Sequence, residues 1–94
     1  MTRKELSAAI AMAMPHLSPT EITKAVKILF QTMTEALQKH QRIEIRGVGS
    51  FSVRYRAARQ VRNPKTGAKM MKAGFYAPYF KAGKAIREQL NKLY

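Results

Sequence analysis

The sequence predicts an α+β fold with the element order helix, helix, strand, strand, strand, helix. Three observations lead to this prediction. Apolar residues recur at three- and four-residue spacing in the first 41 residues, alternate with polar ones from residue 42 to about residue 56, and return to helical spacing after residue 81. With 94 residues, the chain makes one domain near the lower limit for a useful core.

Two helices are predicted in residues 1–41, and each has a sequence signal at its start. Thr2 and Glu5 form a T-x-x-E capping box, and the helix that follows ends at Pro15. Residues 18–21 form a second start, with proline in the first helical position, and predict a long helix to about Lys39. The expected apolar faces consist of Leu6, Ala9, Ile10, Ala13 and Met14 in the first helix and Ile22, Val26, Leu29, Met33 and Leu37 in the second.

A sheet and a hairpin are predicted over residues 42–80. Residues 42–46 and 50–56 alternate between apolar and polar, as strands with one solvated face do, and residues 47–49 read as a turn. From Ala57 to Gly74 the apolar residues are too few to cover a core, so a ribbon there projects from the body. The expected result is a three-stranded antiparallel sheet with a protruding arm over about residues 55–74, which turns at Asn63, Thr66 and Gly67.

The last part of the chain is predicted to return to the body and end in a short helix. Residues 75–80 are expected to be the end of the returning strand and a connection. A helix over residues 81–94 follows, with an apolar face of Ala82, Ile86, Leu90 and Leu93 and the cations Lys81, Lys84 and Arg87 near its start.

The charge points to a polyanionic partner. The chain has 18 Lys and Arg against 5 Asp and Glu, a formal net charge of +13. Residues 42–94 contribute thirteen cations and two acids, and no acid lies between Glu44 and Glu88. Because such a charge repels itself in the compact state, a basic surface kept only for solubility is the weaker interpretation.

Few residues are available for other kinds of chemistry. Five acids, two histidines and no cysteine leave little for a catalytic triad, a carboxylate pair or a metal site, so neither enzyme activity nor a cofactor or small-molecule substrate is expected. His16 is expected between the two helices and His40 at a helix end, each as a surface or capping residue and not as a metal ligand. The apolar run Ala8–Met14 is too short for a signal peptide or a membrane span.

The cations of the arm suit a groove of duplex nucleic acid, where phosphates lie on both sides. Alternation places Arg54, Arg56 and Arg62 on one face of the outgoing strand and Arg59 on the other. Arginine favours forked hydrogen bonds and the narrow, strongly negative minor groove. The predicted arm contacts are Arg54, Arg56, Arg59, Arg62, Asn63, Lys65, Lys69 and Lys72.

Several motifs make the sequence resemble a known family. MT-x-x-EL, RIEIRG-x-GSFS, YRA-x-R, RNPKTG and YFKAGKAIRE are similar to segments of the HU and integration host factor proteins, which bend DNA in the bacterial nucleoid, and most closely to the β-subunit branch. The resemblance extends over essentially the whole chain. It implies a cytoplasmic protein with no membrane partner. The protein is expected to form an intertwined dimer, either a homodimer or a heterodimer with a related subunit.

The resemblance also implies roles for particular residues. Two arms wrap the minor groove of double-stranded DNA, and Pro64 at each arm tip is the wedge between base pairs, with Arg62 and Asn63 beside it. Glu44 and Arg46 match the place where the β subunit adds some sequence preference. The implied phosphate contacts of the body are Arg3, Lys4, Lys81, Lys84 and Arg87.

The sequence departs from the family at three positions, and it leaves two other functions open. Val48 stands where the family usually has phenylalanine, Ala58 where the β subunit has proline, and Val61 where glycine precedes the tip motif, so the resemblance implies least about the course of the arm.

An RNA-binding or ribosome-associated protein is the alternative function, because Tyr76, Tyr79 and Phe80 are able to stack on single strands, although core packing at a strand-to-helix junction also explains them. A cationic membrane binder is disfavoured by the few cations in the first helix.

Overall fold

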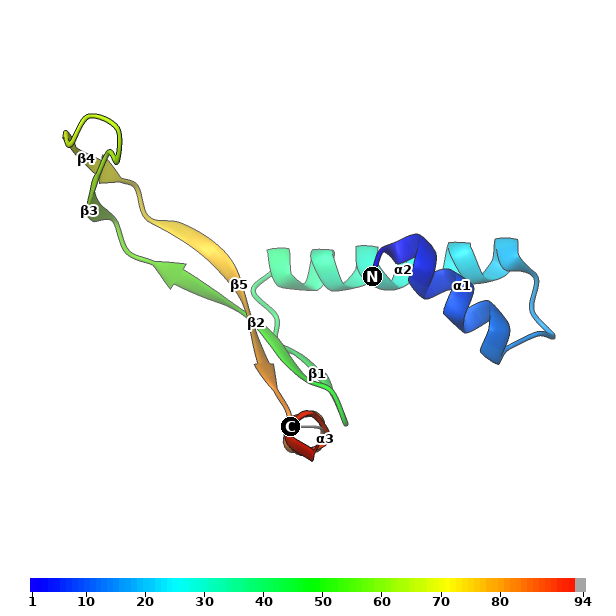
Figure 1. Ribbon diagram of the computed structural model, residues 1–94. Coiled ribbons are helices and arrows are strands. Elements are labelled where there is room, and N and C mark those ends of the chain that lie inside the picture. Colours follow the sequence, from blue (N-terminus) through cyan, green and yellow to red (C-terminus); the bar gives the residue numbers. More distant parts are fainter. Residues whose placement is uncertain (93–94) are drawn as a thin grey trace. The chain divides into compact units, whose positions relative to one another are not determined.

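The computed structural model describes residues 1–92 and confirms the α+β class (Figure 1). The chain divides into two compact units, Met1–Ala36 and a second unit from Leu37 onward, and each is described by itself. The elements are α1 (Arg3–Ala13), α2 (Pro19–Gln38), β1 (Ile43–Ile45), β2 (Gly49–Arg56), β3 (Arg59–Arg62), β4 (Lys69–Lys72), β5 (Phe75–Ala82) and α3 (Lys84–Lys92).

Both predicted helix starts are present in the first unit. The Thr2 hydroxyl accepts a hydrogen bond from the Glu5 amide at 3.1 Å and caps α1. At α2 the capping box is reciprocal: the Glu21 amide donates to the Ser18 hydroxyl at 3.1 Å, and the Ser18 amide donates to the Glu21 carboxylate at 3.3 Å. Among residues 1–92, only Ile22 and Val26 on α2 are buried, with 3% and 5% of their surface exposed.

Helix α2 ends in a left-handed cap at the start of the second unit. His40 has a φ of 58°, and its amide donates to the Leu37 carbonyl at 2.9 Å. The His40 ring lies 4.7 Å from the Tyr76 ring, between centroids. His40 is therefore a capping residue, as predicted.

The main sheet has the antiparallel strand order β1-β2-β5. The β1–β2 turn is closed by the Val48 amide, which donates to the Ile45 carbonyl at 3.0 Å. Residues 75–80 belong to the returning strand, as predicted, but the predicted connection is wrong, because β5 pairs with β2 without interruption from Phe75 to Ala82. Pro78 is compatible with this strand because β5 lies at the sheet edge, where a residue without an N–H group is tolerated.

The sheet separates apolar from polar side chains. The register places Ile43, Phe51 and Phe80 in one row across the three strands, and the Phe51 and Phe80 rings lie 4.8 Å apart. The opposite face is called the polar face here. It carries Glu44, Ser50, Ser52, Arg54, Arg56, Phe75, Ala77, Tyr79 and Lys81.

The arm is a second ladder that continues beyond the main sheet (Figure 1). Strands β3 and β4 pair from Arg59↔Lys72 to Arg62↔Lys69, and Val61 is half-buried opposite Met70. The ladder is broken at residues 57–58 and 73–74, which are alanines except for Gly74. The sequence did not predict this break, which follows from the lack of large side chains to pack there. The Tyr55 hydroxyl occupies the space that a side chain at Gly74 would need.

The tip turn has the predicted chemistry. The Asn63 amide donates to the Ala68 carbonyl at 2.9 Å, and the Gly67 amide donates to the Asn63 carbonyl at 2.8 Å. Side chains close the turn further, since Asn63 Oδ1 accepts from the Lys65 amide at 2.8 Å and Thr66 Oγ1 accepts from the Ala68 amide at 3.3 Å. Gly67 has a φ of 70°, a conformation that favours glycine.

Helix α3 begins later than predicted. The Gly83 amide donates to the Val48 carbonyl at 2.9 Å and joins the start of α3 to the β1–β2 turn. Lys81 and Ala82 consequently belong to β5 and not to the helix. The predicted helix position Leu93 lies outside the described residues. In residues 1–92, no helix is both long and apolar enough to cross a membrane.

Candidate nucleic-acid interface

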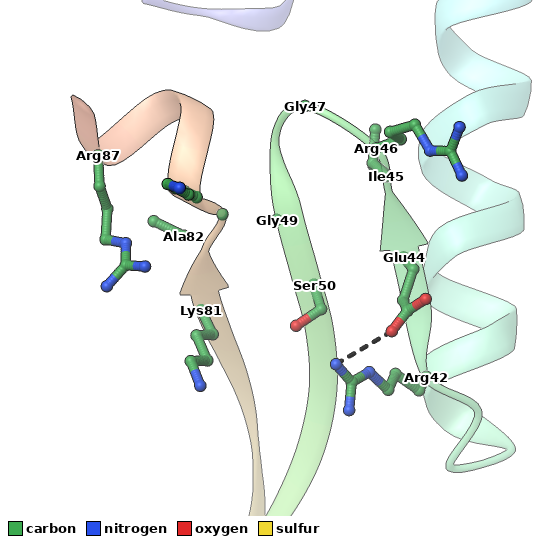
Figure 2. A pocket seen from close by; sticks show the side chains of 12 residues that line it. Arg42, Glu44, Ile45, Arg46, Gly47, Gly49, Ser50, Lys81, Ala82 and Arg87 are labelled. Atoms are coloured by element: carbon green, nitrogen blue, oxygen red, sulfur yellow. Dashed lines mark ion pairs between the residues drawn. The ribbon is translucent and has the colours of Figure 1, made fainter. Parts of the chain in front are cut away.

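A basic pocket lies where the polar face meets α3. It is open, has a volume of about 600 Å³, and is lined by residues from β1, β2, β5 and the first turns of α3. All five of the predicted body residues from the second unit line it, which are Glu44, Arg46, Lys81, Lys84 and Arg87. Figure 2 shows Lys81 and Arg87 on one side of Ser50 and the β1 side chains on the other.

Glu44 is paired with a residue that sequence reasoning missed. The Arg42 guanidinium lies 3.1 Å from the Glu44 carboxylate, and both side chains remain mostly exposed at 63% and 72%. Arg46 points away from this pair (Figure 2). Because Arg42 precedes Glu44 by two residues in an extended segment, the alternation itself was the signal that these side chains share a face.

The pocket keeps a large excess of positive charge. Lys84 forms an exposed ion pair with Glu88 at 3.9 Å, which is a weak interaction in water. Glu44 is the one acid that lines the pocket, against the five cations Arg42, Arg46, Lys81, Lys84 and Arg87. The pocket is therefore suited to an anion with several charges, such as a run of phosphates.

Lys81 joins the pocket to the rest of the polar face. It stands opposite Ser50 on β2, whereas the sequence placed it at the start of a helix. Further along the same face, Arg54 and Arg56 follow at two-residue intervals and are exposed. Cationic side chains thus extend from the pocket toward the arm on one face of one sheet.

The arm carries its cations on both faces of the ribbon. The register places Arg59 and Lys72 together on one face, and Arg62 and Lys69 together on the other. Pro64 and Lys65 are exposed in the tip turn. The predicted separation of Arg59 from Arg62 follows directly from this register. The ladder break means that simple alternation does not extend from Arg56 to Arg62.

Arg3 and Lys4 belong to the other unit. They lie in the first turn of α1 and line a groove of about 350 Å³ with residues of α1 and the start of α2. Arg3 and Lys4 therefore do not line the basic pocket, which is formed by residues of the second unit.

Aromatic rings on the polar face hold two of the cations. The Arg54 guanidinium carbon lies 3.6 Å from the centroid of the Tyr79 ring, and Lys72 Nζ lies 5.0 Å from the centroid of the Phe75 ring. Sequence reasoning missed both contacts. Arg54 and Tyr79 form a diagonal pair across β2 and β5, which becomes visible only when the register is known. Lys72 and Phe75 lie three residues apart, on either side of residues 73–74.

The aromatic residues that suggested RNA stacking are engaged within the chain. The prediction that they lie at a strand-to-helix junction is wrong, because all three lie in β5. Tyr79 is covered by Arg54, Phe80 packs on Phe51, and Tyr76 contacts both Tyr55 and His40. The expectation that core packing explains them is only partly right, since 61% of Tyr76 and 44% of Phe80 remain exposed in the single chain.

Comparisons with known proteins agree on one family. A family model described as bacterial DNA-binding protein matches residues 1–91. The integration host factor subunit beta of Colwellia psychrerythraea is 48% identical over 91 residues, which are 97% of this chain and 96% of that protein. The corresponding subunit of Vibrio cholerae is also 48% identical, and the match covers 97% of this chain and 99% of that protein.

Solved structures give the same result. A cocrystal structure of Anabaena HU with DNA matches with a TM-score of 0.87 and 33% identity, and the match covers 96% of this chain and 97% of that one. A variant of HU from Thermotoga maritima matches with a TM-score of 0.69 and 29% identity over 96% of this chain and 99% of that one.

Proposed function

The chain belongs to the bacterial DNA-binding protein family, and on this premise we propose that it binds duplex DNA as a dimer and bends it sharply. The observation that supports this most is the distribution of charge on the polar face. From the basic pocket through Arg54 and Arg56 to the arm, the chain presents cations and only the one acid Glu44. A surface of this kind binds phosphates along both edges of a groove.

A second copy of the chain, or a related subunit, completes the fold in this proposal. Among the described residues only Ile22 and Val26 are buried, so the single chain has little core of its own. Large apolar side chains remain exposed, among them Ile28 and Leu29 on α2, which are 53% and 51% exposed. Burial of such residues against a partner supplies the core that one chain lacks.

The two arms of the dimer enter the minor groove. We assign residues 55–74 to the arm, where Arg59, Arg62, Lys65, Lys69 and Lys72 contact phosphates and groove walls. Pro64 is exposed at the tip and has no N–H group to satisfy, which supports the proposal that it wedges between base pairs. Architectural proteins of this same class are the established example of such apolar wedges, in which unstacking a base step allows more protein surface to be wrapped.

The helices and the basic pocket have separate roles. Residues 1–41 form the dimer body, and the basic pocket holds phosphates of the DNA that the arms bend toward it. Arg3 and Lys4 contribute at the body as well. Glu44 and Arg46 modulate sequence preference, and the protein acts on chromosomal DNA in the nucleoid.

The dependence of DNA binding on salt tests the proposal. If a dimer neutralises about eight to ten phosphates, log K falls against log salt with a slope of roughly −7 to −9. Between 50 and 200 mM salt this amounts to a loss of affinity of roughly 10⁴- to 10⁵-fold. Fluorescence anisotropy with a labelled duplex measures the slope, and a value near zero would contradict binding through phosphates.

A further inference from the structure

Two aromatic residues on the polar face, the half-buried Tyr79 and the exposed Phe75, each lie beneath a cation. Tyr79 lies beneath Arg54 at 3.6 Å, and Phe75 lies beneath Lys72 at 5.0 Å. Both rings belong to β5, two residues on either side of Ala77, and Ala77 stands directly opposite Arg54. The small Ala77 side chain leaves the Arg54 side chain free to lean across it onto the Tyr79 ring.

The acid-free sequence explains why an aromatic ring, and not a carboxylate, holds this arginine. No acid occurs between Glu44 and Glu88, and the ion pairs of the described residues lie elsewhere, at Arg42 and Lys84. A carboxylate would order an arginine but would also neutralise its charge. The face of an aromatic ring attracts the guanidinium through its quadrupole and leaves the full positive charge available to a phosphate.

We propose that Tyr79 is a positioning residue that orders the Arg54 guanidinium on the polar face before DNA arrives. An arginine that already occupies one orientation loses less side-chain entropy on binding a phosphate. This inference rests on the proposed function, because it assumes that the anion contacted by Arg54 is a DNA phosphate. Phe75 has the same relation to Lys72, but the longer distance makes the effect weaker.

A double-mutant cycle tests the proposal with the full-length protein and duplex DNA. Tyr79→Leu is expected to lower affinity about three- to ten-fold for each disordered side chain, and thus roughly ten- to hundred-fold for the two protomers of a dimer, while the salt slope stays unchanged because the charges remain. Arg54→Ala is expected to lower affinity. It should also make the slope of log K against log salt shallower by roughly 0.9 for each lost phosphate contact. In the Arg54→Ala background, Tyr79→Leu is expected to have no further effect.

A conservative variant distinguishes the effect of the Tyr79 ring from that of its hydroxyl. A measurement on the DNA-free protein shows whether the Tyr79→Leu variant is still folded. Tyr79→Phe keeps the aromatic face and is expected to bind like the original protein. In the free protein, the Arg54 side-chain protons should be shifted upfield in NMR spectra by the ring current, and Tyr79→Leu should remove this shift while the amide spectrum of the sheet remains.

The outcomes distinguish this inference from the proposed function. Equal losses from Tyr79→Leu in the presence and absence of Arg54 would overturn the positioning role, and so would a Tyr79→Phe variant as weak as Tyr79→Leu. In both cases the salt slope of the unaltered protein would still support DNA binding. If the unaltered protein showed no salt-dependent binding, both the function and the inference would be overturned.

Discussion

A substitution at Gly49 is expected to destabilise the site through one backbone contact. Gly49 has a φ of 155°, and a Cβ atom there would lie 3.0 Å from carbons of the Phe80 ring and closer still to the Lys81 carbonyl oxygen. The backbone strain of Gly49→Ala costs about 1–3 kcal/mol, and the forced separation of β2 from β5 costs a further ~1–3 kcal/mol, as overpacking does. The free energy of unfolding is therefore expected to fall by about 2–6 kcal/mol.

Gly83 provides a matched control in the same basic pocket. A Cβ atom at Gly83 would meet its nearest neighbour, the Val48 carbonyl oxygen, at 3.4 Å, which is ordinary contact. Gly83→Ala should thus stay within about 1 kcal/mol of the original protein. Urea unfolding followed by circular dichroism at one fixed protein concentration measures both variants, because the stability of a dimer depends on concentration. Equal losses from the two variants, or a Gly49→Ala loss below about 1 kcal/mol, would refute the steric argument.

Two further predictions concern DNA binding. The hydrogen bonds of the tip turn are made by Asn63, Thr66, Gly67 and their neighbours, with no part for Pro64. Pro64→Ala is therefore expected to preserve the turn, to reduce the bend angle measured by FRET between duplex ends, and to lower affinity by less than about ten-fold. Lys65→Ala is the control and is expected to weaken binding with little change in the bend angle. If Pro64→Ala lost affinity and bend angle to the same degree, the wedge role of Pro64 would be contradicted. Glu44→Gln removes the acid of the basic pocket and should raise affinity for random-sequence duplex roughly two- to five-fold at low salt. Its exposed pair with Arg42 contributes under about 1 kcal/mol to stability, and weaker binding to random duplex would show that Glu44 itself contacts DNA.

Local chemistry explains which parts of the fold could be predicted. The capping boxes at Thr2 and Ser18, the left-handed cap at His40 and the tip turn at Asn63 each depend on residues within about five positions of one another. Each such motif satisfies backbone groups that would otherwise be unpaired, so residue type alone carries most of the information.

The errors fall where a partner distant in sequence decides the local structure. Residues 75–80 contain a proline and closely spaced aromatic residues, which predicted a strand end followed by a connection, but pairing with β2 continues the strand to Ala82. That pairing also moved Lys81 from the predicted helix to the polar face. Similarly, the stacking of Arg54 on Tyr79 depends on the register of β2 and β5.

By itself, the sequence determined the α+β class, the two N-terminal helices, the chemistry of the tip turn and the excess of positive charge. These properties follow from periodicity, capping and composition, which act over a few residues or over the whole chain. Only the tertiary structure decided that Lys81 shares a face with Arg54 and Arg56, that Gly49 and Gly83 line one basic pocket, and which arginine rests on an aromatic ring. The physical reason is that strand register brings together side chains more than 20 residues apart, and a shift of one position would move each of them to the opposite face.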